Sequence, residues 1–237
     1  MDAVIHSAAL HAPHVGVLPD SEFERVNVQA TQALAVLAAR MGVRRFVFTS
    51  TTALYGAGAA GGHGAAWVDE DTPPKPQTVY HRSKLAAEQA LEALWRPLGL
   101  SVTVLRMSRC FPEAAPLMAL YRLHRGVDAR DVASAHACAL AWDHPGFRRY
   151  VVSGHTPFVP ADAAGLLLDA PEVLARRAPE LVQAFARHGW LLPRSIDRVY
   201  CAERALRELH WLPRHGFANV LALLDAHSTE VLPPEGS

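Results

Sequence analysis

Tyr80 and Lys84 are four residues apart in the segment Tyr80-His81-Arg82-Ser83-Lys84. On a helix this spacing puts a phenol and an ammonium group on one face, within reach of a common ligand. A nearby ammonium group favours phenolate, so Lys84 is expected to lower the pKa of Tyr80 from about 10 toward the range of a general acid or base. The same spacing is common on solvated helix faces, so the pair alone is weak evidence for a catalytic site. The position of the pair relative to other residues decides how strong that evidence is.

Four hydroxyl residues, Thr49-Ser50-Thr51-Thr52, follow the apolar run Arg45-Phe46-Val47-Phe48. Open α/β sheets bind ligands at the carboxyl ends of their strands, and this cluster stands at such an end. A hydroxyl there can donate to the carbonyl oxygen of a substrate while a tyrosine gives or takes the proton. The alternative is that these hydroxyl groups only serve as hydrogen-bond partners for the end of the strand.

Strands and helices are predicted to alternate along the first two thirds of the chain. Short apolar runs that end in small or hydroxyl residues predict buried parallel strands. Apolar residues at helical spacing between a capping residue and a glycine predict helices. Strand, helix and strand within about 50 residues form one crossover unit, so the predicted fold class is α/β. The expected strands are residues 2–9, 45–50, 101–106 and 149–152, and the expected helices are residues 20–42, 78–95, 131–142 (capped by Asp131), 179–188 (opened by Ala170-Pro171-Glu172) and 201–209.

Composition excludes several classes of function. Lysine plus arginine (23) equals aspartate plus glutamate (23), so the chain has no net charge to attract nucleic acid or anionic lipid. No apolar stretch approaches the roughly 18 residues of a membrane span, and the first residues lack a basic targeting region, so we expect a soluble cytoplasmic protein. Its three cysteines have no Cys-x-x-Cys spacing, which argues against disulfides and a zinc ribbon.

The order of these features resembles the extended short-chain dehydrogenase/reductase family, in its NAD-dependent epimerase/dehydratase group. The match covers nearly the whole chain, and it is the order and spacing of several pieces that carries it. The matching pieces are His6-x-Ala8-Ala9, Val26-Asn27-Val28-x-x-Thr31, Gly42-Val43-x-Arg45 through Thr51 with Tyr55-Gly56, Tyr80-x-x-x-Lys84-x-x-x-Glu88, Leu105-Arg106, Val127-Asp128-x-x-Asp131-Val132-Ala133 and Leu209-His210-Trp211-x-Pro213.

The resemblance implies roles for individual residues. Tyr80 would be the catalytic acid or base, Lys84 would modify its pKa and bind the nicotinamide ribose, and Thr51 would orient the substrate. The cofactor, NAD or NADP, would carry the hydride chemistry. Family members are often dimers through a helix pair that includes the tyrosine-bearing helix, which implies a homodimer. The residues implied to line the cofactor are Ser7, Ala8, Ala9, Asn27, Thr49, Tyr80, Lys84 and Met107.

The chain departs from the family at its start. The family begins with a strand and a glycine-rich turn that holds the pyrophosphate, whereas this chain opens on what resembles the family's fourth strand. Roughly sixty residues, about two crossover units, are therefore expected to be absent, through a misassigned start or a truncated gene product. The literal G-x-G-x-x-G at residues 56–61 is not the missing turn, because more glycine and then Pro73-Pro74 follow it where a helix is required. Residues 56–66 are instead expected to form a mobile surface loop.

Two further departures bear on the reaction. The dehydratase branch carries an Asp-Glu pair directly after the orienting threonine, and this chain has Thr52-Ala53 there, which favours reduction, oxidation or epimerisation over dehydration. The loop at residues 107–113 stands where many sugar-nucleotide enzymes have asparagine and then Tyr-Gly-Pro. Arg109 of this loop either meets a polar or anionic substrate or has a surface or ion-pair role. The histidines at 6, 11 and 14 are interpreted as satisfied or solvated imidazoles, so no metal site is expected.

The sequence therefore predicts an NAD(P)-dependent oxidoreductase or epimerase that acts on a small carbonyl, alcohol or sugar-like molecule. The alternative is a catalytically inactive, truncated remnant of the fold with a binding or interaction role only. The expected organisation is a partial Rossmann-like parallel sheet without its first strands (1–153), a mostly helical substrate-binding region (154–230) and a frayed tail (231–237). The substrate would be a small molecule, with no nucleic acid or membrane partner.

Overall fold

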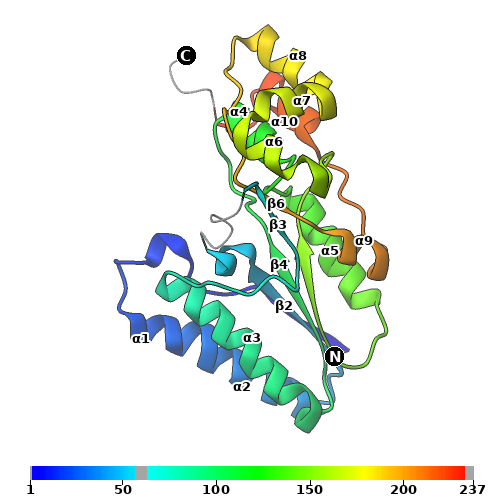
Figure 1. Ribbon diagram of the computed structural model, residues 1–237. Helices are drawn as coiled ribbons and strands as arrows, with labels where there is room; N and C mark the ends of the chain where they lie inside the picture. The colour runs from blue at the N-terminus through cyan, green and yellow to red at the C-terminus, as the bar shows by residue number, and fades with distance from the viewer. Residues whose placement is uncertain (1, 57–62, 233–237) are drawn as a thin grey trace.

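A four-stranded parallel sheet forms the centre of the molecule in the computed structural model, which describes residues 2–56 and 63–232 (Figure 1). The strand order is β1-β2-β4-β5. This arrangement confirms the predicted α/β class with a parallel, Rossmann-like sheet. The strands are β1 (Ala3–His6), β2 (Arg45–Thr51), β4 (Ser101–Met107) and β5 (Phe147–Val152).

Helices cover both faces of this sheet (Figure 1). Side chains alternate between the faces along a strand, so Phe46 and Phe48 of β2 pack toward one helical layer and Val47 packs toward the other. The first layer contains α1 (Asp20–Phe23), a π-helical segment (Glu24–Gln29), α2 (Ala30–Arg40) and α3 (Val79–Leu98), and the second contains α5 (Ala129–Ala141) and α9 (Glu203–Glu208).

A second, mostly helical lobe lies beyond the carboxyl ends of the strands (Figure 1). It has its own apolar core, which includes Leu166, Leu174, Leu181 and Val220. The core also takes in α4, although the predicted domain division places that segment with the sheet; the division stays a prediction. The lobe contains α4 (Ala115–Tyr121), α6 (Ala163–Leu168), α7 (Ala170–Arg177), α8 (Pro179–His188) and α10 (Phe217–Asp225), and short 3-10 turns occur at Ala12–His14, Thr52–Tyr55 and Pro160–Asp162.

The strand register brings the carboxyl ends of three strands, β1, β2 and β4, to the same end of the sheet. His6 at the end of β1 pairs with Phe48 of β2, and Thr51 at the end of β2 pairs with Met107 at the end of β4. The loops that follow these strands therefore start side by side. The carboxyl ends of the strands are where ligands bind in open parallel sheets.

The first strand is less buried than the sequence predicts. It spans only Ala3–His6, and its outer edge has no neighbouring strand within the described residues. Ile5 is accordingly 46% exposed. An apolar run typical of a strand with two neighbours thus lies at the edge of the sheet.

The helix after Val127 begins with a different cap from the one predicted. Asp128, in extended conformation, accepts a hydrogen bond from the backbone N–H of Arg130 at 2.9 Å and caps α5. Asp131 lies inside the helix, where its carboxylate accepts from the backbone N–H groups of Arg214 and His215, both at 2.9 Å. The prediction of Asp131 as the cap is wrong because this carboxylate binds the chain after Trp211 instead.

Several segments of the second lobe also differ from the predictions. Residues 170–188 form two helices, α7 and α8, where one was expected. The expected loop at 56–66 ends in buried Ala65 and a short strand, β3 (Ala66–Val68), that pairs with β6 (Arg198–Tyr200). Residues 57–61 of the G-x-G-x-x-G segment lie outside the described residues. Residues 233–237 of the expected frayed tail also lie outside them, but Val231, its first residue, is buried. No helix in the described part of the chain is long and apolar enough to cross a bilayer.

A fully buried ion pair fixes α3 to the sheet. Glu88 of α3 accepts hydrogen bonds from Nε and Nη2 of Arg106 on β4, the latter at 2.7 Å, and from the hydroxyl of Ser50 on β2. The other end of Arg106 donates to the Tyr55 hydroxyl at 2.8 Å. Bidentate geometry and additional partners are what a buried ion pair needs to offset the loss of hydration.

We expect Glu88→Gln to lower the free energy of unfolding by about 3–5 kcal/mol, because it leaves the Arg106 charge buried without a counter-ion. Urea denaturation measures the change. The matched control is Glu92→Gln, one turn later on α3, because Glu92 is half exposed and pairs with Arg149. Its expected loss is at most about 1 kcal/mol. Equal losses for the two variants would contradict the role given to Glu88.

Candidate active site

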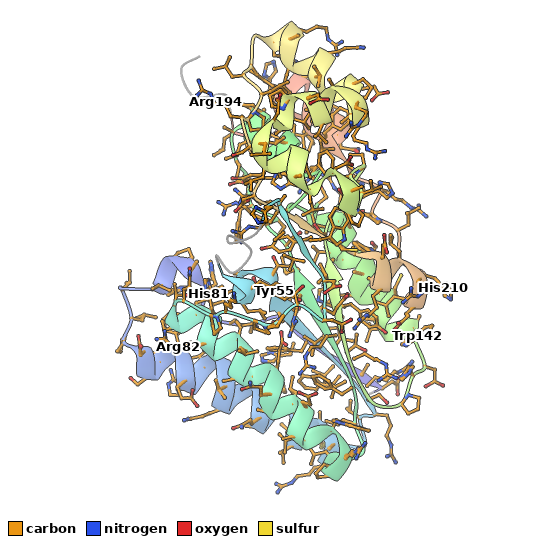
Figure 2. The ribbon with its side chains drawn as sticks, viewed as in Figure 1. Tyr55, His81, Arg82, Trp142, Arg194 and His210 are labelled. Atoms are coloured by element: carbon orange, nitrogen blue, oxygen red, sulfur yellow. The ribbon has the colours of Figure 1, made fainter. Side chains whose placement is uncertain are left out.

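A cavity of about 540 Å³ opens at the carboxyl ends of β1, β2 and β4. It lies beside the first turn of α3, and Figure 2 shows His81 of that turn and Tyr55 at this end of the sheet. Most of the residues singled out from the sequence line it, although they come from distant parts of the chain. These are Ser7, Ala9, Thr49, Thr51, Tyr80, Lys84, Met107 and Arg109.

Two of the singled-out residues, Ala8 and Asn27, do not line this cavity. Asn27 is buried in the π-helical segment, where its side-chain amide donates to the Leu10 carbonyl and the Ser83 hydroxyl, both at 2.9 Å. Its oxygen accepts from the Leu10 N–H at 2.8 Å. The Ser83 hydroxyl in turn donates to the Tyr80 carbonyl. Asn27 thus connects the loop after β1 to the first turn of α3. π-Helical turns are frequent at functional sites.

Lys84 is almost completely buried, with 2% of its surface exposed. Its ammonium group donates to the Thr49 carbonyl at 2.7 Å and lies 3.9 Å from the centre of the Phe48 ring. Burial lowers the pKa of Lys84 from 10.5 to about 7, and the Glu88 carboxylate opposes this shift. A lysine held in this way is poised between its charged and neutral forms near neutral pH.

The Tyr80 hydroxyl faces the same cavity, but its pKa shifts in the direction opposite to the one predicted. Burial raises the pKa of Tyr80, and a hydrogen bond with the Thr51 side chain opposes the rise. The predicted lowering by Lys84 is wrong for this structure because the ammonium group is directed to the Thr49 carbonyl. Tyr80 is therefore a phenol at neutral pH.

Thr49 connects the cavity to the opposite helical layer. The Nδ1 atom of His136 on α5 faces the Val132 carbonyl at 2.8 Å, and a carbonyl can only accept, so Nδ1 carries the proton. In the neutral ring the other nitrogen, Nε2, then accepts from the Thr49 hydroxyl at 2.7 Å. The Thr49 carbonyl therefore holds Lys84, while His136 fixes the side chain of Thr49.

Sequence reasoning missed several residues of the site. His81, Arg125 and Tyr200 line the cavity, and His136 supports Thr49 from below. His81 could have been found, because it follows Tyr80 directly in the helix. Arg125 and Tyr200 carry no local signal, since only tertiary folding brings them to the strand ends.

The histidines near the start of the chain have separate surroundings. His6 is buried and hydrogen-bonds to the Thr31 hydroxyl at 2.8 Å. His11 and His14 form an edge-to-face pair in the loop after β1. Within residues 2–56 and 63–232, no three His, Cys, Asp or Glu side chains are grouped so that they could hold a metal ion.

We expect Lys84→Met to stabilise the protein at neutral pH, because it replaces a buried charge with an apolar side chain of similar length. Below pH 7 both the folded and the unfolded chain hold the Lys84 proton. Between about pH 7 and 10.5 only the unfolded chain holds it, so Lys84 makes the wild-type protein more stable as pH rises through this window. Thermal unfolding of both proteins from pH 6 to 10 should show this slope in their difference.

The same pKa can be read directly by NMR. The chain has two lysines, Lys75 and Lys84, so ¹³C-lysine labelling gives two side-chain resonances that the Lys84→Met variant assigns. One resonance is expected to titrate near pH 7. Titration of both above pH 10, together with a pH-independent difference in melting temperature, would contradict the described burial.

Comparison with known proteins finds relatives that are named as dTDP-glucose 4,6-dehydratases. A sequence family described as the NAD dependent epimerase/dehydratase family matches residues 1–115. The dTDP-glucose 4,6-dehydratase of Streptomyces antibioticus is 30% identical over 243 residues, which cover 93% of this chain and 68% of that protein. The mouse dTDP-D-glucose 4,6-dehydratase is 32% identical over 111 residues, or 47% of this chain. That match spans only 30% of the mouse protein.

A solved structure supports the fold over nearly the whole chain. The structure of DesIV, a dTDP-glucose 4,6-dehydratase from Streptomyces venezuelae with NAD and TYD bound, superposes with a TM-score of 0.62. The sequence identity is 23%, and the match covers 93% of this chain and 71% of DesIV.

Proposed function

Because this chain belongs to the NAD-dependent epimerase/dehydratase family, we propose that it is an NAD(P)-dependent reductase or epimerase of a small carbonyl, alcohol or sugar-like substrate. The observation that carries the proposal is the meeting of Thr51, Tyr80 and Lys84 in one cavity at the carboxyl ends of the parallel strands. A structural role alone does not require a phenol, a hydroxyl and a buried ammonium group to face the same space.

The residues of the cavity fit the nicotinamide end of such a cofactor. Ser7 and Ala9 are small, so the wall after β1 leaves room for a flat ring. Lys84 uses one of its three donors on the Thr49 carbonyl, so its other donors can bind ribose hydroxyls. The cofactor supplies or accepts the hydride.

Tyr80 and Thr51 would move and guide the proton. The raised pKa keeps Tyr80 as a phenol, so it can give its proton to the oxygen of a carbonyl that is being reduced. The Thr51 oxygen accepts from the Ala53 N–H at 3.0 Å, and the Thr51 side chain hydrogen-bonds with Tyr80. A bound substrate oxygen would take the place of the Tyr80 oxygen as the acceptor of the Thr51 hydroxyl proton. In the oxidative direction Tyr80 would take the proton back from the alcohol.

The lining of the cavity favours reduction or epimerisation over dehydration. Eliminating water needs an acid and a base beside the reacting carbons, and carboxylates commonly serve as these groups. Thr52 and Ala53 stand directly after Thr51, and none of the described residues that line the cavity is an aspartate or a glutamate. This supports a ketone or a secondary alcohol as the reacting group.

The competing proposal is a catalytically inactive protein of the same fold with a binding role. The observation that favours it is that β1, with exposed Ile5, has no second neighbouring strand in the part of the chain that the structure describes, and unpaired strand edges pair readily with other chains. An inactive protein would not need to keep Tyr80 and Thr51 in hydrogen-bond contact, so the enzyme remains the stronger proposal. The homodimer and the cytoplasmic location stay predictions.

We expect Tyr80→Phe to lower turnover by about 10²–10⁴-fold while cofactor affinity changes little, because the substitution removes only the proton-transferring hydroxyl. The measurement is the oxidation of NADH and NADPH with a panel of small ketones and keto sugars. Tyr150→Phe is the control, since Tyr150 is buried and donates to Glu208 on the α9 side of the sheet. Unchanged turnover in Tyr80→Phe, or an equal loss in both variants, would contradict the assignment.

A further inference from the structure

Two arginines, Arg109 and Arg125, line the cavity and lie against one tyrosine ring. The guanidinium carbon of Arg125 is 4.2 Å from the centre of the Tyr121 ring, and that of Arg109 is 5.9 Å from it. The backbone holds the two together, because the Arg109 N–H donates to the Arg125 carbonyl at 3.2 Å. Stacking on an aromatic face orients a guanidinium group without using its hydrogen-bond donors.

Both arginines keep donors that the protein does not use. Nε of Arg109 donates to Glu113 at 2.6 Å, but its two Nη atoms have no acceptor among the described residues. Arg125 donates from Nη2 to the Tyr121 hydroxyl, and its Nη1 lies 3.7 Å from Asp197. Its Nε is buried and has no hydrogen-bond partner among the residues that the structure describes. Buried polar atoms are normally hydrogen-bonded, so this Nε of a cavity-lining residue needs an explanation.

The charges around the cavity are of one sign. Its described ionisable lining consists of Lys84, Arg109, Arg125, two histidines and two tyrosines. Glu113 and Asp197, which pair with the two arginines, do not line the cavity. Among the described residues, a ligand in the cavity therefore meets guanidinium groups and no carboxylate.

We propose that Arg109 and Arg125 bind a compact anionic group of the substrate, a carboxylate or a phosphate monoester, while Tyr80 and Thr51 act on its carbonyl or alcohol. This assignment rests on the proposed function, and it narrows the substrate to small anionic molecules. Guanidinium groups bind carboxylate and phosphate through paired hydrogen bonds, which gives both affinity and orientation. The substrate would then be held at two points, its anionic group at the arginines and its reacting oxygen at Tyr80.

The size of the cavity favours a compact anion over a nucleoside diphosphate. Cavities of about 300–1,000 Å³ hold one drug-sized ligand, and this one, at about 540 Å³, must also admit the nicotinamide end of the cofactor. This volume leaves room for one anionic group and a short carbon chain.

The proposal can be tested without knowing the substrate, by calorimetric titration with malonate and with inorganic phosphate at low ionic strength and about pH 8. We expect saturable binding of one anion, weakened about 10-fold or more in Arg125→Gln and in Arg109→Gln. Arg109 is half exposed, so its substitution does not endanger folding. Arg204→Gln is the matched control, because Arg204 is 29% exposed against 30% for Arg125 and also pairs with an aspartate.

Unchanged anion affinity in both variants would overturn the proposal, and so would an equal loss in Arg204→Gln. Titration with dTDP and UDP decides between anion classes. If either binds through Arg109 and Arg125 at least 10-fold more tightly than malonate and phosphate do, the pair is a nucleotide site and the proposal is wrong. Because these titrations need neither cofactor nor turnover, their failure is distinguishable from an inactive Tyr80.

Discussion

The buried ion pair between Glu88 and Arg106 is the constraint on which the site depends. A carboxylate in the middle of α3 and a guanidinium near the end of β4 are buried and share bidentate hydrogen bonds, and Ser50 of β2 also donates to the carboxylate. Such a pair is costly to break because either partner alone would be a buried, uncompensated charge. It therefore fixes both the distance and the rotation of α3 relative to the strand ends.

That rotation decides what faces the cavity. Tyr80, Lys84 and Glu88 are spaced by four residues and share one face of α3, so fixing Glu88 on the sheet turns the other two toward the ends of β2 and β4. In this position the Lys84 ammonium group loses its hydration, which the Thr49 carbonyl and the Phe48 ring replace only in part. The lowered pKa of Lys84 reflects that incomplete compensation. The buried network thus makes the site rigid. The shifted pKa belongs to Lys84, the residue that is expected to contact the cofactor.

The sequence predicted those parts of the structure that local patterns determine. Apolar runs gave the parallel strands, and because parallel strands end at one edge, Thr51 and Tyr80 could be expected to meet. Features that depend on distant partners could not be predicted. His136 contacts Thr49 across 87 residues, and the backbone of Arg125 pairs with that of Arg109, 16 residues away. The direction of the Tyr80 pKa shift failed for a related reason, since the spacing of two residues on a helix does not say which acceptor an ammonium group will choose.

Whether the chain binds a nicotinamide cofactor tests the account most directly, and titration of the 237-residue protein with NADH and NADPH, followed by cofactor fluorescence, measures it. We expect saturable binding of one cofactor per chain, and a loss of that binding in Lys84→Met even though the variant is folded and more stable. A folded wild-type protein that binds neither NADH nor NADPH would contradict the account and would leave the inactive protein with a binding role as the better explanation.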